Sequence, residues 1–210
     1  MLLADANPPA PEARQTERDA AIGIVATKLA QAAATHDILY IATDEQRAEA
    51  VAAALACAAP DMLVVHSPSS DALPGDTAPA SPTNVGRRIA ALRRLRVALT
   101  DQQRVAFITT AEAAAAAYPP PPAFDDAPPT LRVGDDVDMT ALAEMLGKIG
   151  YVADDRVDEP GEMAMRGQVV DLYPADAVAP VRIEIVDGAI SAIRLYDPIS
   201  QLGTEPIESI

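Results

Sequence analysis

The chain has 210 residues, of which 50% are hydrophobic and only 3% aromatic, a composition typical of folded domains with aliphatic cores. Sixteen basic and 31 acidic residues give a formal net charge of −15, so the chain as a whole repels nucleic-acid phosphates. One cysteine and two histidines exclude an internal disulfide and a multi-cysteine metal site. Because no apolar run approaches about 18 residues, we expect a cytoplasmic protein with no membrane contact.

The first part of the chain alternates helical and strand patterns. Residues 1–17 are rich in proline and small polar residues, which predicts a disordered tail. Helices are then predicted at 19–34, 44–58, 83–99 and 110–117, and strands at 37–43, 62–66 and 105–109. This alternation is typical of a parallel sheet, so residues 18–118 are predicted to form an α/β lobe.

The turns of this lobe do not carry a phosphate-binding sequence. The turn after strand 37–43 reads T-D-E-Q and the turn after strand 105–109 reads T-A-E-A, both without glycine. Phosphate loops need glycines because the backbone N–H groups must approach the phosphate closely. The only lysines, Lys28 and Lys148, follow no glycine loop. We therefore expect no nucleotide cofactor and no catalytic residues.

The remaining candidate reactive groups are interpreted as structural. His36 and His66 are predicted to lie at strand ends without a carboxylate at ligand spacing, and Cys57 lies in an alanine-rich helix. Acidic pairs such as Asp135-Asp136 and Asp154-Asp155 lack the spacing of a calcium loop. No metal site is therefore expected.

The predicted helix at 83–99 opposes the charge of the chain. Residues 83–104 contain six arginines and one aspartate, a local charge of +5. The residues expected to form the buried apolar stripe are Val85, Ile89, Leu92 and Leu95. The arginines expected to flank it are Arg87, Arg88, Arg93, Arg94 and Arg96. This pattern fits a solvated helix face, or a basic stripe that contacts a protein or DNA phosphates.

A proline-rich segment at 119–129 is predicted to be a linker that can be neither helix nor interior strand. After it, residues 130–210 are predicted to form a small α+β domain with an antiparallel sheet and one helix. Its helix is predicted from Asp138 or Met139 to Ile149, and its strands at 130–133, 162–166, 169–173, 181–186 and 189–196. Gly167-Gln168 and Asp187-Gly188 are predicted as two-residue turns.

Two arginines in this acidic domain are candidate partner-binding residues. In the run 181–186, Val181, Ile183 and Ile185 alternate with Arg182, Glu184 and Val186, which predicts one buried and one exposed face. Exposed arginines on a rigid sheet are frequent interface anchors, and their replacement should hardly affect stability. The alternative is pairing within the domain, for example of Arg182 with Glu184 or of Arg166 with Glu162.

Several motifs together resemble a known family. They are S-P-x-x-D-x-L-P at 67–74, D-R-V-D-E-P-G-E-M-A-M-R-G-Q-V-V-D-L-Y-P at 155–174, P-V-R-I-E-I at 180–185 and A-I-S-A-I-R-L-Y-D-P at 189–198. In this order and spacing the chain resembles the amino-terminal module of the Mfd family of transcription–repair coupling factors. That module is in turn similar to part of the excision-repair protein UvrB.

The resemblance implies a fold and a partner. Residues 18–118 would be a degenerate RecA-like lobe without a phosphate loop, and residues 130–210 a UvrB-interaction domain that binds a UvrA-like protein. By the resemblance, Arg166, Arg182 and Val186 would contact that partner, and Val186 stands where the family usually has an aromatic residue. Gly75 likewise replaces a tyrosine.

The implied role is a non-catalytic interaction module of nucleotide excision repair. In the family, the rest of an Mfd-type translocase is a further partner, and DNA is contacted only indirectly. One alternative is a fragment or relative of a DNA-repair ATPase or helicase whose motor domains lie outside the chain. Another is direct DNA contact through the basic helix at 87–96.

Overall fold

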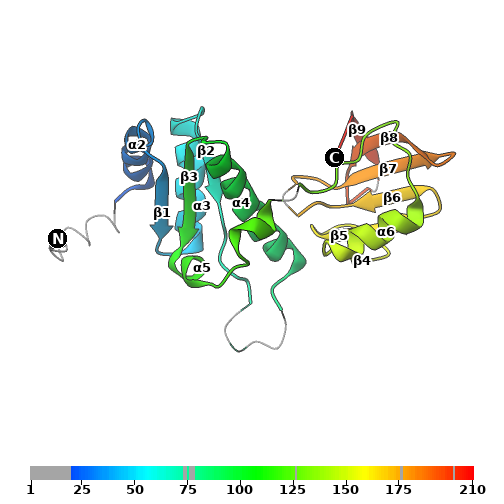
Figure 1. The fold of residues 1–210 in the computed structure, drawn as a ribbon, viewed down its shortest axis with the longest axis horizontal. Helices are drawn as coiled ribbons and strands as arrows, with labels where there is room; N and C mark the ends of the chain where they lie inside the picture. The colour runs from blue at the N-terminus through cyan, green and yellow to red at the C-terminus, as the bar shows by residue number, and fades with distance from the viewer. Residues whose placement is uncertain (1–19, 73–74, 76–78, 126, 176, 201) are drawn as a thin grey trace. The chain divides into compact units, whose positions relative to one another are not determined.

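A computed structural model describes residues 20–210 except 73–74, 76–78, 126, 176 and 201, so the predicted tail at 1–17 lies outside the described residues (Figure 1). The chain divides into two compact units: Met1–Ser69 with Arg94–Pro119, and Ser70–Arg93 with Pro120–Ile210. This division assigns residues 70–93 to the second unit, whereas the proline-rich segment alone predicts a boundary at 119–129. Each unit is described separately below.

The first unit contains a parallel sheet of three strands in the order β1-β3-β2. Its strands are β1 (Ile38–Ala42), β2 (Leu63–His66) and β3 (Val105–Thr110), and its complete helices are α2 (Ile22–Ala33), α3 (Glu45–Ala58) and α5 (Ala111–Ala115). The predicted elements and the parallel α/β class are therefore confirmed, with small differences at the ends. Asp44 caps α3, because its carboxylate accepts a hydrogen bond from the backbone N–H of Arg47.

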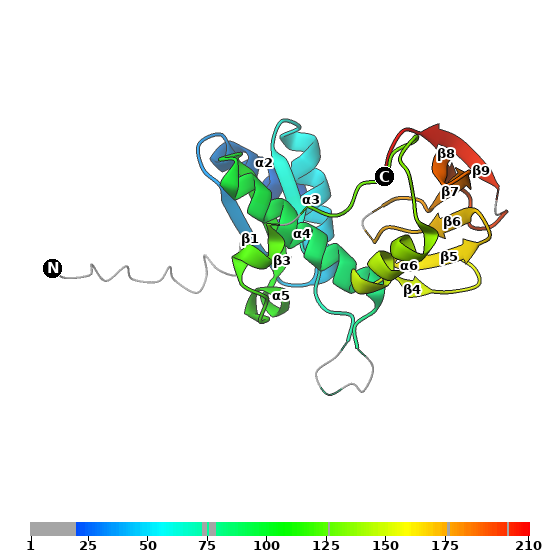
Figure 2. The same ribbon diagram turned by 45° about the vertical axis from the view of Figure 1, so that its right-hand side comes forward.

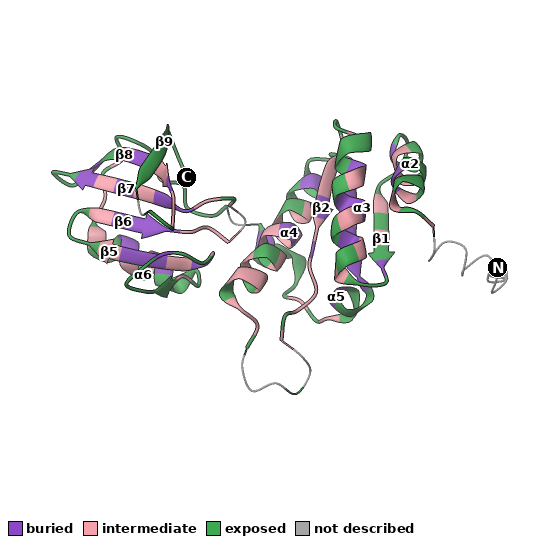
Figure 3. Ribbon diagram, turned by 180° about the vertical axis from the view of Figure 1, so that it is seen from behind, coloured by how far each residue is buried: buried purple, intermediate pink, exposed green. Residues whose placement is uncertain are grey.

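The core of this unit is made largely of alanine. Ala26 of α2, Ala48 and Leu55 of α3, and Ala106 and Ile108 of β3 belong to one buried cluster. Small side chains let the helices approach the sheet closely, which explains how a chain with so few aromatic residues closes a core. Figure 3 shows the buried residues of α3 along one side of the helix.

Helix α4 (Pro82–Thr100) buries a different face from the one predicted. Val85 and Ile89 are 44% and 42% exposed, whereas Ala91 and Ala98, seven residues apart on one side of the helix, are buried. The expected apolar stripe is therefore wrong at Val85 and Ile89. The physical reason is again close packing, because alanine permits a nearer approach than the larger aliphatic side chains.

The proline-rich segment contains one short element. Pro121–Phe124 forms a 3-10 helix, and Phe124 is buried. The expectation that this segment cannot be helical is therefore wrong for these four residues. Proline is compatible with the first turn of a helix, since its missing N–H would have no helical partner there.

The second unit contains a six-stranded sheet in the order β4-β5-β6-β7-β8-β9 and helix α6 (Met139–Lys148) (Figures 1 and 2). The strands are β4 (Val152–Ala153), β5 (Glu162–Arg166), β6 (Val169–Leu172), β7 (Val181–Val186), β8 (Ala189–Tyr196) and β9 (Gly203–Ile207). Strands β5 to β8 form the predicted antiparallel arrangement, and β9 extends it by pairing antiparallel with β8.

Three details of the second unit differ from the prediction. Strand β4 pairs in parallel with β5, which makes the sheet mixed. The predicted strand at 130–133 is reduced to a single bridge between Arg132 and Ser209. Strand β9 was not predicted, because its sequence, G-T-E-P-I, lacks alternating apolar residues.

Helix α6 covers one face of this sheet. Leu142 and Leu146 of the helix share a buried cluster with Val170, Ile183 and Ile193 of three adjacent strands. The predicted turn Asp187-Gly188 is confirmed, since both residues have positive φ angles, 53° and 83°. Such values are typical of the turn that matches the twist of a β-hairpin.

Among the described residues, no helix is long and apolar enough to cross a membrane.

Candidate protein-interaction site

The sheet of the second unit has a polar face opposite α6, here called the outer face. The register aligns Arg166 with Val169, Asp171 with Arg182, and Arg182 with Arg194 on neighbouring strands. Because alternate residues of each strand point to opposite faces, Arg166 and Arg182 share the outer face. The predicted alternation in β7 is confirmed: Val181, Ile183 and Ile185 are buried, and the residues between them are not.

Arg182 forms an ion pair within the domain. Its Nε atom donates a hydrogen bond to Oδ1 of Asp171 and its Nη2 atom donates one to Oδ2, both at 2.7 Å. The side chain of Asp171 is 3% exposed and that of Arg182 22%. The alternative of internal pairing is thus realised, with Asp171 as the partner instead of Glu184. This pair could be predicted only from the register of β6 and β7, which the predicted hairpin turns do not define.

The ring of Tyr196 packs against the same arginine. The guanidinium carbon of Arg182 lies 5.1 Å from the centre of the Tyr196 ring, a cation–π distance. The Tyr196 hydroxyl donates a hydrogen bond to the backbone oxygen of Val157, and burial raises the pKa of this phenol above its usual value. Hydrogen bonding to Asp171 likewise raises the pKa of Arg182. Arg182 is therefore held in one orientation as a permanent cation.

Arg166 is exposed but also anchors a loop. Its Nη2 atom donates a hydrogen bond to the backbone oxygen of Asp155. Asp155 belongs to residues 154–161, a connection between β4 and β5 that Tyr196 also holds through Val157. The predicted pairing of Arg166 with Glu162 does not occur in the structure, where Glu162 accepts hydrogen bonds from backbone N–H groups of the same loop.

Val186, the third residue given by the resemblance, is 53% exposed at the end of β7. It lies directly before the Asp187-Gly188 turn, where β7 and β8 meet. The side chain is accessible to a partner, but it is smaller than the aromatic residue expected there. Gly75 also lies outside any regular element.

The candidate basic stripe is spread around α4. Arg87 and Arg94 are exposed, whereas Arg88, Arg93 and Arg96 are partly buried. At 3.6 residues per turn these five positions do not form one line along the helix. Contact with DNA or protein through these arginines therefore stays a prediction.

The carboxyl ends of the parallel strands in the first unit carry acidic groups. Asp44 occupies the N-terminus of α3 and Glu45 its first turn. The backbone N–H of Ser69 donates to Glu45 Oε2 at 2.8 Å, and Ser69 Oγ lies 2.6 Å from Thr110 Oγ1. In nucleotide-binding proteins a phosphate occupies the N-terminus of such a helix. Here carboxylates take that place and would repel a phosphate.

His66 has a neighbour that sequence spacing did not reveal. Its Nε2 atom lies 3.0 Å from Oε1 of Glu45, although the alignment is not that of a hydrogen bond. The expectation of no nearby carboxylate is wrong here, because α3 brings Glu45 to the end of β2. No group of three or more metal-ligating side chains occurs within the described part of the chain.

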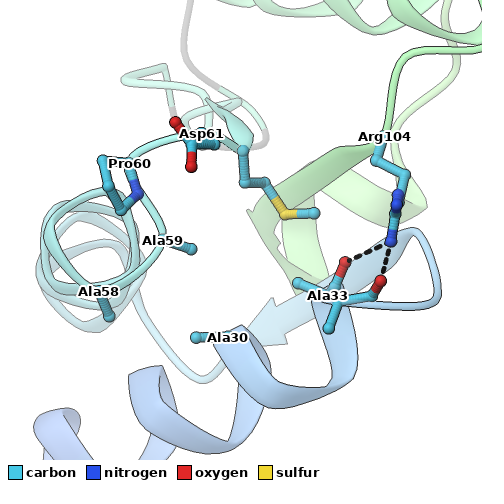
Figure 4. Close-up of a pocket in the computed structure, with 9 residues that line it drawn as sticks. Ala30, Ala33, Ala58, Ala59, Pro60, Asp61 and Arg104 are labelled. Atoms are coloured by element: carbon cyan, nitrogen blue, oxygen red, sulfur yellow. Dashed lines mark hydrogen bonds between the residues drawn. The ribbon is translucent and has the colours of Figure 1, made fainter.

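A shallow cavity of about 400 Å³ lies at the opposite, amino-terminal end of these strands (Figure 4). It is lined mainly by alanines from the C-terminal ends of α2 and α3, together with Arg104. Arg104 donates hydrogen bonds to the backbone oxygens of Ala33 and Ala34, which terminate α2. Arg104 therefore caps a helix, and the two helix C-termini disfavour an anion in this cavity.

Comparison with known proteins shows that most of the second unit is similar to a known family. Residues 130–210 match the UvrB interaction domain family. The match covers α6 and all six strands of the mixed sheet, including Arg166, Arg182 and Val186. The candidate site therefore lies entirely within the residues that match the UvrB interaction domain family.

The similar curated proteins are transcription-repair-coupling factors. The protein of Bacillus subtilis (strain 168) is 28% identical over 150 residues, 71% of this chain and 12% of the relative. The protein of Staphylococcus haemolyticus is 29% identical over 147 residues, 70% of this chain and again 12% of the relative. These matches confirm the resemblance to the Mfd family, and the chain spans only a small part of the length of these relatives.

The ion pair on the outer face leads to a stability prediction. Replacing Arg182 by alanine leaves the buried carboxylate of Asp171 without its cation, so the free energy of unfolding should fall by about 3–5 kcal/mol. The double variant Asp171→Leu/Arg182→Met removes both charges and should regain most of that loss. Urea titrations followed by circular dichroism measure both. Arg132→Ala, at an exposed position, is the control and should change stability by less than about 0.5 kcal/mol.

Buried Tyr196 predicts a loss of stability at alkaline pH. Because folding raises the pKa of this phenol above 10.0, its stabilising effect is complete below pH 10 and is lost as the pH rises through the folded-state pKa. The free energy of unfolding, measured between pH 8 and about pH 12, should fall more steeply in the wild type than in Tyr196→Phe. Equal slopes would contradict a buried, protonated phenol.

Proposed function

We propose that this chain is a non-catalytic protein-interaction module of nucleotide excision repair and that its second unit docks on a UvrA-like protein. The observation that carries the proposal is the match of residues 130–210 to the UvrB interaction domain. The names of the relatives, transcription-repair-coupling factors, support a role in repair linked to transcription. In such a role the module would recruit a partner, and any motor activity would belong to other segments.

The outer face has the properties of a rigid interface. Interface anchors bind more tightly when they are held in place before binding, since less side-chain entropy is lost. Asp171 and Tyr196 hold Arg182 in this way, and Arg166 is exposed on the same face. The two cations would face carboxylates or carbonyl oxygens of the partner. Arg182 would act mainly by stabilising the conformation of the outer face, and Arg166 by direct contact with the partner.

For the first unit we propose a degenerate RecA-like lobe that binds no nucleotide. The parallel sheet and the flanking helices support the α/β class, and Asp44 and Glu45 support the loss of phosphate binding. A carboxylate at a helix N-terminus already satisfies the N–H groups and the dipole that a phosphate would use. Without a phosphate site, the lobe would serve as a scaffold for the interaction domain.

Binding of purified UvrA tests the proposed partner. The wild-type chain should bind UvrA in a calorimetric titration, and Arg166→Ala should weaken binding by about 2 kcal/mol or more, roughly 30-fold. Arg132→Ala removes the same type of side chain from the same domain and should leave the affinity unchanged. Absence of wild-type binding, or equal affinities for all three proteins, would contradict the proposal.

Thermal unfolding with ATP tests the proposed absence of nucleotide binding. Addition of millimolar ATP and magnesium should leave the melting temperature of the chain unchanged. A ligand present at 100 times its Kd would stabilise the fold by about 2.7 kcal/mol, which is readily detected. A clear rise in melting temperature with ATP, absent with sodium sulfate of equal ionic strength, would show that the lobe has kept a nucleotide site.

A further inference from the structure

The connection between β8 and β9 exposes two large apolar side chains. Ile199 is 86% exposed and Leu202 67%, both more than Val186. A single exposed aliphatic residue on a protein surface is ordinary, but two on one short connection form a local apolar projection. Neither the fold nor the buried clusters of the second unit use these side chains.

Hydrogen bonds hold several described residues of this connection. The carboxylate of Asp197 accepts hydrogen bonds of 2.9 Å from the backbone N–H of Ile199 and from the hydroxyl of Ser200. The backbone N–H of Asp197 donates to the backbone oxygen of Leu202 at 3.1 Å. The two apolar side chains therefore belong to residues whose backbones are hydrogen-bonded to Asp197.

Hydrogen bonds join this turn to the outer face. Arg156 donates from Nη2 to the backbone oxygen of Pro198 at 2.7 Å. Arg156 belongs to the same connection, residues 154–161, that Arg166 and Tyr196 hold against the outer face. Residues 154–161 therefore contact both the turn that carries Ile199 and the Arg166 side chain of the candidate site.

We propose that Ile199 and Leu202 are the apolar anchor by which the outer face binds its UvrA-like partner. This inference rests on the proposed function, because it concerns the same surface. The partner would present an apolar recess beside the acceptor groups that face Arg166. Interfaces commonly combine a desolvated apolar centre with charged groups at its edge. Ile199 and Leu202 follow the end of β8 opposite to Val186, so the anchor adds apolar contact at a second position instead of filling the place of the missing aromatic residue.

The test compares UvrA binding of variants that change only these side chains. Ile199→Ser/Leu202→Ser removes the apolar surface at positions that the fold leaves exposed, so the variant should fold normally. Its affinity for purified UvrA, measured by calorimetric titration, should fall about tenfold or more. Ile199→Met/Leu202→Met keeps the apolar character and should bind within about threefold of the wild type.

Ile149→Ser is the matched control. Ile149 is 52% exposed and follows α6, which covers the opposite face of the sheet, so its replacement should not change the affinity. Wild-type affinity of the double serine variant, together with weakened binding by Arg166→Ala, would overturn the anchor and leave the proposed function intact. Absence of UvrA binding by the wild type would instead overturn the proposed function.

Discussion

The ion pair between Asp171 and Arg182 determines the shape of the candidate interface. Both charges lie in the middle of the sheet, and each is acceptable there only because the other is present. The pair in turn places the guanidinium over Tyr196, whose hydroxyl holds the neighbouring connection. An arginine that is a partner contact by resemblance is therefore also a structural residue. A change in binding at Arg182 consequently cannot be assigned to lost contact alone, whereas a change at Ile199, whose side chain is 86% exposed, can.

The sequence predicted the elements of both units well because their signals are local. Apolar spacing located the helices and most strands, and Asp187-Gly188 located a hairpin turn. Strand β9 and the parallel pairing of β4 could not be predicted, since neither the sequence G-T-E-P-I nor a strand of two residues carries an alternating apolar pattern. The buried face of α4 was also predicted wrongly. The prediction placed the larger apolar side chains in the core, but the structure buries Ala91 and exposes Ile89, because the smaller side chain permits closer packing.

The candidate site was predicted in part. The alternation in β7 placed Arg182 on the polar face, and the resemblance added Arg166 and Val186. The partner of Arg182 was not predicted, because residues 171 and 182 become neighbours only through the register of two strands. The contact of Glu45 with His66 was missed in the same way, because it depends on α3 placing its first turn beside the end of β2. Pairs of charges that depend on strand register or helix placement can be identified only from the structure, whereas local patterns can be identified from the sequence.

The parallel pairing of β4 and β5 has a consequence for how this surface can vary. Parallel neighbours normally need a crossover of about a dozen residues or more, often with a helix. Here residues 154–161 form the whole crossover, without a helix. They are held by hydrogen bonds with Arg166, Tyr196 and Pro198. An inserted or deleted residue would shift all three contacts at once. Apart from Arg156 and Val157, whose side chains hold the crossover in place, its side chains can therefore change more readily than its length, which sets the spacing between the charged and apolar parts of the surface.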